Sequence, residues 1–333
     1  MSLDPKAWGF ARFFSRRKDQ ETPPELRPEK FKECRVIAIG NERGGVFKTG
    51  WTILLARQIV DDYRLQDLYG RKPRVAMVGL DPAAALEGYC GFQDEKLNSI
   101  RGVALHQAMH HPDVDGKEPL PLEVVRQQIS RDIDLYPAHP DLAGYDARMQ
   151  HFRQLVVDAQ LEGNEEAAAK CMEKLRAYQQ LLVTFIGILR TQYDRVLIDF
   201  KPGESQLNVA GLLAANDVHI PTVMEQESIT QARRMAELVH EVRGRNPNLQ
   251  ITAVIPTNYD KRDRQQEYWY DTIRKPPKST NVVDLSSLVT EPIAADRDMK
   301  KIIERAGSPA YRRTIYKVAG KTFEEIMQRE GAW

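Results

Sequence analysis

The sequence predicts an α/β fold, with a doubly wound and mainly parallel sheet flanked by helices. Two observations support this prediction. From Arg35 onward, short apolar runs alternate with longer amphipathic segments, and the short runs are rich in Val, Ile and Leu with few polar interruptions. Strands of this kind are typical of a sheet that helices cover on both faces. In such sheets, ligands bind beyond the carboxyl ends of the strands.

The expected strands follow one another at intervals long enough for a helical crossover. In chain order they are residues 35–40, 74–80, 133–138, 194–200, 217–223, 250–257 and 281–289. The helix-length segments between and after them are residues 49–66, 205–215, 228–245, 297–306 and 310–329.

Two segments are longer than a simple crossover requires. Residues 146–192 are rich in Ala, Glu and Lys in the middle, and Gly163-Asn164 is a turn signal, so we expect a helical hairpin there. Residues 259–282 carry charged and aromatic side chains before Pro276-Pro277, which predicts a helix followed by an exposed loop.

Composition excludes several classes of protein. The 333 residues contain 48 Lys and Arg against 47 Asp and Glu, with 42% hydrophobic residues, so the chain is neither disordered throughout nor uniformly basic. No apolar stretch approaches the roughly 18 residues of a membrane span, and no secretory signal is visible. The three cysteines, Cys34, Cys90 and Cys171, lack metal-ligand spacing and are expected to be reduced thiols in a cytoplasmic protein.

Residues 1–34 differ from the rest and are expected to be an extension and linker. Residues 1–18 combine Trp8 and three phenylalanines with five basic side chains against Asp4 alone, and prolines interrupt the polar stretch that follows. Such a segment can form an amphipathic helix that binds an anionic membrane or a partner. The alternatives are a tail that packs on its own domain, or residues added for expression.

The strand expected at 35–40 leads into a glycine-containing loop, Lys48-Thr49 and an amphipathic helix. Glycines let backbone N–H groups approach phosphate oxygens, the helix dipole and lysine favour negative charge, and the hydroxyl can hold Mg²⁺. The ordinary phosphate-loop pattern GxxxxGK[ST] is not satisfied, because Glu42 and Phe47 stand where its glycines belong.

The loop nevertheless resembles the deviant phosphate loop of the ParA/MinD family of ATPases, KGGxGKT[ST], to which residues 43–50 align without gaps. By this resemblance Lys48 binds phosphate and acts in catalysis, and Thr49 is a magnesium ligand. Arg43 stands at the signature lysine, which reaches the phosphates of a partner across a dimer; arginine keeps the charge but is not a conservative exchange. Phe47 must direct its ring away from the phosphates. The remaining nucleotide-binding positions implied by the alignment are Gly44, Gly45, Val46 and Gly50.

Further segments resemble the family in the correct order. GLDPAAAL is similar to the DxDPQ motif, which makes Asp81 the residue that orients the attacking water and puts Gly79 at the first aspartate. YDRVLIDFKPGES is similar to the Walker B and switch segment, so Asp199 is expected to hold Mg²⁺ through water, with Lys201 at a family proline. Residues 253–266 resemble the segment near adenine, which suggests Asn258 as a base contact.

The resemblance spans residues 35–328 and implies an ATPase domain over 35–330 with its insert at 146–192. It implies binding and slow hydrolysis of ATP with Mg²⁺, a switch between monomer and nucleotide-sandwich dimer, and an adaptor that is ParB-like or linked to cargo. Nonspecific DNA is the expected surface, in which case the protein is nucleoid-associated. Basic residues concentrated near the C-terminus suit binding to a phosphate backbone, although a solvated helix face has the same composition. They are Lys300, Lys301, Arg305, Arg312, Arg313, Lys317 and Lys321.

Three functions therefore remain open. The first is an ATPase that partitions plasmid DNA or other cargo on a DNA surface. The second is a MinD-like positioning ATPase at the membrane, attached through residues 1–18, since the acidic C-terminal end is a poor anchor. The third is a degenerate member that serves as a nucleotide-gated scaffold with little hydrolysis, using residues 146–192 as a docking surface.

Overall fold

The computed structural model describes residues 33–83, 85–90, 105–277, 282–294 and 309–330, with side chains in the last range from residue 319 onward. The expected N-terminal extension and the helix expected at 297–306 lie outside these residues. Within them, no helix is long and apolar enough to cross a bilayer.

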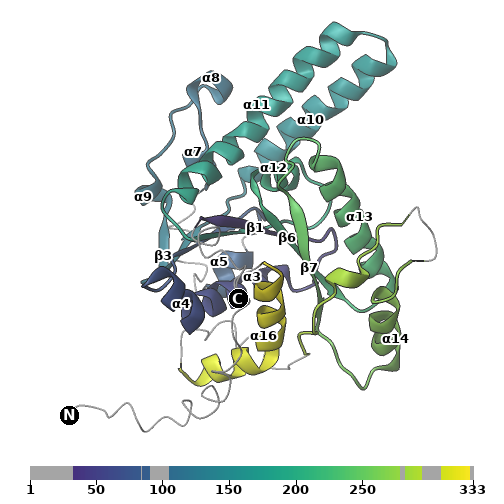
Figure 1. Cartoon of the computed structure of the whole chain (residues 1–333). Coiled ribbons are helices and arrows are strands. Elements are labelled where there is room, and N and C mark those ends of the chain that lie inside the picture. Colours follow the sequence, from purple (N-terminus) through teal and green to yellow (C-terminus); the bar gives the residue numbers. More distant parts are fainter. Residues whose placement is uncertain (1–32, 84, 91–104, 278–281, 295–308, 331–333) are drawn as a thin grey trace.

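A seven-stranded sheet forms the centre of the molecule, in the order β3-β4-β2-β5-β1-β6-β7 (Figure 1). Six strands run parallel, and β3 pairs antiparallel with β4 at one edge. The strands are β1 (Arg35–Ile39), β2 (Val75–Gly79), β3 (Gln127–Ser130), β4 (Ile133–Tyr136), β5 (Arg195–Asp199), β6 (Asp217–Val223) and β7 (Gln250–Thr257). The predicted doubly wound, mainly parallel fold is confirmed.

One strand was missed and one strand prediction was wrong. The polar edge strand β3 was missed, and the described part of 281–289 forms no strand beyond a single bridge between Val254 and Val289. There the Asp284 carboxylate accepts a hydrogen bond from the Ser286 N–H at 2.9 Å, and a 3-10 turn, η3 (Ser286–Leu288), follows. This side chain–backbone bond competes with an extended ladder.

Helices cover both faces of the sheet. The segment expected as one helix at 49–66 is two, because the Asp62 carboxylate accepts hydrogen bonds from the N–H groups of Arg64 and Leu65 and begins a new helix. The helices are α3 (Lys48–Asp61), α4 (Tyr63–Tyr69), α5 (Ala85–Tyr89), α7 (Leu105–Ala108), α8 (Pro112–Asp115), α9 (Leu122–Val125), α10 (Leu142–Leu161), α11 (Glu165–Arg190), α12 (Gln206–Ala214), α13 (Gln226–Val242), α14 (Arg264–Ile273) and α16 (Pro309–Arg329).

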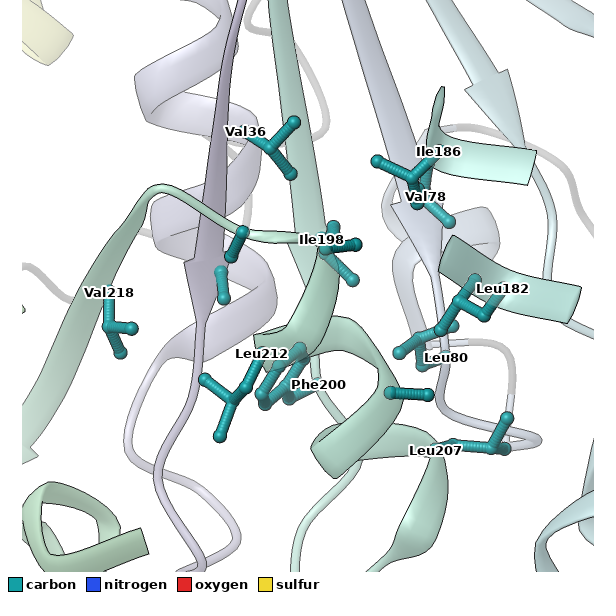
Figure 2. Close-up of a cluster of buried hydrophobic side chains, with 14 of the residues drawn as sticks. Val36, Val78, Leu80, Leu182, Ile186, Ile198, Phe200, Leu207, Leu212 and Val218 are labelled. Carbon is teal, nitrogen blue, oxygen red and sulfur yellow. The ribbon is translucent and has the colours of Figure 1, made fainter. Parts of the chain in front are cut away.

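Alternate side chains of each central strand enter different cores. Val36 and Ala38 of β1 pack on the face covered by α11, α12 and α13, whereas Ile37 and Ile39 pack on the face covered by α3 and α16. Figure 2 shows the first core, where Phe200 lies beside Leu212 beneath the strand ends. Burial on both faces explains the nearly continuous apolar character of these strands.

Helices α10 and α11 pair as a hairpin that extends beyond the sheet (Figure 1). The chain reverses at Gly163, whose φ of 71° lies in the left-handed region that glycine adopts readily. The Asn164 side chain then accepts a hydrogen bond from the Ala167 N–H and begins α11.

Candidate nucleotide-binding site

The phosphate loop connects β1 to α3 at the carboxyl edge of the sheet. Gly45 has a φ of 74°, and the side chain of Asn41 fixes the start of the loop. Its amide nitrogen donates to the Pro221 carbonyl at 2.9 Å, and its oxygen accepts from the Arg43 N–H at 3.0 Å. The sequence analysis did not single out Asn41, although a polar residue directly after a predicted strand was a usable signal; the structure shows that it is buried.

Lys48, Thr49 and Asp199, three of the predicted site residues, lie close together. Thr49 donates a hydrogen bond to the Asp199 carboxylate at 2.7 Å, and the Lys48 ammonium donates to the Arg43 carbonyl at 2.7 Å within the loop. Burial lowers the pKa of Lys48, and the carboxylates of Asp199 and Asp81 oppose that shift. The lysine therefore lies within electrostatic reach of both predicted aspartates.

The donor set fits Mg²⁺. Asp199 is 1% exposed, and burial raises its pKa to about 7, against the effects of Thr49 and Lys48. Because the neighbouring groups offset only part of the cost of burying this carboxylate, a bound cation would stabilise its charged form. The hydroxyl of Thr49 and the oxygens of Asp199 are the hard ligands that Mg²⁺ takes, directly or through water.

Asp81 follows β2, the strand next to β5. The pairing of these strands places Gly79 in register with Asp199, and Asp81 lies just beyond on the same edge of the sheet. Its carboxylate accepts a hydrogen bond from the Ala83 N–H at 3.0 Å. The structure thus brings Asp81 to the side of the site where Lys48 and Asp199 meet.

Glu87 was missed by the sequence analysis. Its side chain returns from α5 to the end of β2, where its Oε1 accepts a hydrogen bond from the Ala138 N–H at 2.6 Å. Only 1% of the residue is exposed, and burial raises its pKa to about 7. No pattern in the sequence marks it, because the approach depends on how the chain folds back after β2.

Phe47 and Gly50, two departures from the family pattern, are in contact. Phe47 adopts a φ of 72° at the N-cap of α3, and its ring lies over Gly50. A β-carbon built on Gly50 would lie 2.3 Å from Cε2 of that ring. A side chain at residue 50 would therefore require the Phe47 ring to move.

A family described as an AAA domain matches residues 34–251, about two thirds of the chain. The chain belongs to the ParA/MinD-like family of P-loop ATPases. Two uncharacterised proteins of Mycobacterium tuberculosis strains are 31% identical over 230 residues, 69% of this chain but only 59% of their own length. The chromosome-partitioning ATPase Soj of Thermus thermophilus is 29% identical over 233 residues, which cover 69% of this chain and 72% of Soj.

Solved structures of low identity agree with the ParA/MinD-like fold. A putative plasmid partition protein from Borrelia burgdorferi bound to AMPPNP has a TM-score of 0.62 at 18% identity, covering 89% of this chain and 98% of that one. Cobyrinic acid a,c-diamide synthase from Mycobacterium smegmatis, with bound ATP analogue and magnesium, has a TM-score of 0.56 at 23% identity, covering 86% and 98%.

Arg43, which the sequence analysis aligned with the signature lysine, forms ion pairs with the start of α13. Its guanidinium lies 2.8 Å from a Glu225 oxygen and 2.6 Å from a Glu227 oxygen. These contacts hold Arg43 beside its own loop in the isolated chain.

Asn258 lies at the carboxyl end of β7, close to the loop. It is exposed and has a φ of 51°, and the preceding Thr257 donates a hydrogen bond to the Val46 carbonyl at 3.1 Å. Its contact with a base remains a prediction.

Lys201 connects the segment after Asp199 to the helical hairpin. Its ammonium lies 2.6 Å from Asp146 on α10. The same carboxylate accepts hydrogen bonds from the Ser205 hydroxyl and from the N–H groups of Gln206 and Leu207 at the start of α12. The hairpin is thereby anchored to the loop that follows Asp199.

The predicted DNA-binding residues are not tested by these contacts. Lys300, Lys301 and Arg305 lie outside the described residues, as does the segment 1–18. Arg312, Arg313 and Lys317 lie on α16, in the part described without side chains.

Proposed function

We propose that this chain binds ATP with Mg²⁺ and hydrolyses it slowly. The observation that carries the proposal is the position of buried Lys48 at the start of α3, near enough to Asp81 and Asp199 for both carboxylates to act on its charge. The Thr49 hydroxyl donates a hydrogen bond to Asp199. Phosphoryl transfer needs charge neutralisation and a positioned water rather than covalent participation of the protein. Mg²⁺ held by Thr49 and Asp199 would neutralise phosphate charge.

Asp81 is the residue proposed to orient the attacking water. ATP turnover by the intact chain should exceed background and fall by about 100-fold or more in Asp81→Ala, within the range typical of a lost acid–base group. Asp113→Ala is the matched control, since the Asp113 side chain is 91% exposed on α8. Equal turnover in wild type and Asp81→Ala would refute the role of Asp81.

ATP is proposed to switch the chain from monomer to sandwich dimer, with Arg43 reaching the partner's phosphates. Light scattering during size-exclusion chromatography should show a dimer with ATP and Mg²⁺, and a monomer in Arg43→Ala. Arg262→Ala is the control, because its side chain is 85% exposed and pairs with Asp260, two residues away. A monomer at all ATP concentrations would refute the switch.

The dimer is proposed to work on a DNA surface in the cytoplasm, moving plasmid DNA or other cargo through an adaptor protein. Binding to nonspecific DNA should require ATP and weaken steeply with salt, because counterion release dominates such contacts. No binding at low salt would refute this surface. Sedimentation with anionic liposomes, with and without residues 1–20, tests the membrane-associated alternative.

One observation favours a second function, a nucleotide-gated scaffold with little hydrolysis. The ring of Phe47 lies over Gly50 in the first turn of α3, which also carries Lys48 and Thr49. The α10–α11 hairpin extends beyond the sheet and would offer a docking surface. ATP affinity with turnover no higher than background would support this function over the first.

A further inference from the structure

We propose that Glu87 is a further carboxylate of the nucleotide site, which binds the water shell of the nucleotide-bound cation from the position left open by Gly79. This inference rests on the proposed binding of ATP with Mg²⁺. It adds a residue from α5 to the residues of the phosphate loop, β2 and β5.

The geometry at the end of β2 supports the assignment. A β-carbon built on Gly79 would lie 2.9 Å from the Glu87 Oε1, so the carboxylate occupies the space of a side chain at residue 79. Gly79 pairs in parallel register with Asp199 on the neighbouring strand. Residues in register point to the same face, and neighbouring strands are about 4.8 Å apart, so Glu87 lies on the face of the sheet that carries Asp199.

Half of the Glu87 carboxylate is without a partner in the described chain. Oε1 is bonded to the Ala138 N–H at 2.6 Å, but the buried Oε2 accepts no hydrogen bond among the described residues. An unsatisfied buried acceptor is costly, so this oxygen needs a ligand, such as a proton or a metal-bound water.

The surrounding charges favour a cation there. Asp199 and Asp81 add to the effect of burial in raising the pKa of Glu87, and the pKa of Lys48 responds to both aspartates. The carboxylates of Asp81 and Asp199 therefore both act on Glu87 and on the Lys48 ammonium group. A hydrated divalent cation would offset the excess negative charge of these carboxylates, and its water molecules would donate hydrogen bonds to the Glu87 Oε2.

The competing explanation is purely structural, in which Glu87 only anchors the loop after β4 through Ala138. Glu87→Gln separates the two explanations, because the Gln oxygen can still accept from the Ala138 N–H while the charge is lost. Glu87→Ala removes both the bond and the charge.

The decisive experiment measures the affinity for a fluorescent ATP analogue with Mg²⁺ and with EDTA, alongside ATP turnover. In Glu87→Gln the gain in affinity on adding Mg²⁺ should shrink by at least about tenfold, as for other supporting groups of metal sites, with little change in EDTA. Glu118→Gln, at an exposed position, should behave as wild type.

A relocated carboxylate provides the complementary test. Gly79→Asp combined with Glu87→Ala should recover part of the Mg²⁺-dependent affinity that Glu87→Ala loses. The new aspartate enters the space of the Glu87 carboxylate, and its β-carbon, 3.3 Å from the Ala138 nitrogen, requires only a small shift there. In Gly79→Asp alone, the new side chain should clash with the Glu87 carboxylate and lower the Mg²⁺-dependent affinity for the nucleotide.

Failure of the double variant to recover any Mg²⁺-dependent affinity, in a protein that unfolds like Glu87→Ala in urea, would count against the role of Glu87. Equal Mg²⁺ dependence in wild type and Glu87→Gln, while the wild type binds nucleotide, would overturn only the role of Glu87. A wild type that binds no nucleotide would overturn both this inference and the proposed ATPase function.

Discussion

Replacing Gly50 with alanine should destabilise the chain by about 1–3 kcal/mol, the usual cost of overpacking. In most helices the same change is favourable by about 0.5–1 kcal/mol, because glycine loses more backbone entropy on folding. The expected reversal comes from one neighbour, the ring of Phe47.

The magnitude follows from the contact. An added β-carbon would lie 2.3 Å from Cε2 and 2.6 Å from Cδ2 of Phe47. Ordinary carbon contacts are about 3.5–4.0 Å, so the ring must move by more than 1 Å. In a Phe47→Gly background the obstacle is gone, and the alanine should become stabilising by about 0.5–1 kcal/mol. The two values give a coupling energy of roughly 1.5–4 kcal/mol.

Urea denaturation of the wild type, both single variants and the double variant measures this cycle. Gly187→Ala in α11 is the matched control, because a β-carbon there meets no other atom within 4 Å. It should be stabilising by about 0.5–1 kcal/mol with either residue at position 47. A stabilising Gly50→Ala in the wild-type background, or additivity within about 0.5 kcal/mol, would refute the steric account.

Two further predictions concern stability away from the phosphate loop. Asp146→Ala should lower the free energy of unfolding by about 3 kcal/mol, because it leaves the Lys201 ammonium without its partner and removes the carboxylate that accepts from the first N–H groups of α12. A loss in urea denaturation no greater than that of exposed Asp158→Ala would contradict it. His106 should weaken the fold in acid. Burial and the neighbouring His139 lower its pKa from 6.5 to about 4, so the unfolded chain takes up a proton first as the pH falls, and stability decreases from about pH 6.5 to 4. The free energy of unfolding, measured by urea denaturation, should fall less steeply between pH 6.5 and 4 in His106→Gln than in the wild type. Equal slopes in the two proteins would contradict the role given to His106.

Most of the sheet could be predicted from the sequence because its strands are buried on both faces. Their side chains alternate between two cores, so each strand is a nearly continuous apolar run. The edge strand β3 has the sequence QQIS and no such signal, because it is only partly buried. The apolar residues of 281–289 have the composition of a strand, but the hydrogen bond from the Ser286 N–H to the Asp284 carboxylate favours a turn.

The site was predictable to the extent that its residues belong to contiguous motifs. Lys48 and Thr49 adjoin one another at the start of α3, and Asp199 ends its strand. Glu87 belongs to no motif, because its contribution arises when α5 folds back over Gly79. Phe47 and Gly50 appeared as two separate departures, although residues three apart at a helix start are neighbours.

The central claim, that this chain is a Mg²⁺-dependent ATP-binding protein, is tested most directly by isothermal titration of ATP into wild type and Lys48→Ala. The account predicts saturable binding of one ATP per chain with Mg²⁺, weakened by about tenfold or more in Lys48→Ala, since a charge-assisted hydrogen bond contributes about 1.5–3 kcal/mol. Absence of binding to the wild type, or equal affinity in the two proteins, would contradict it.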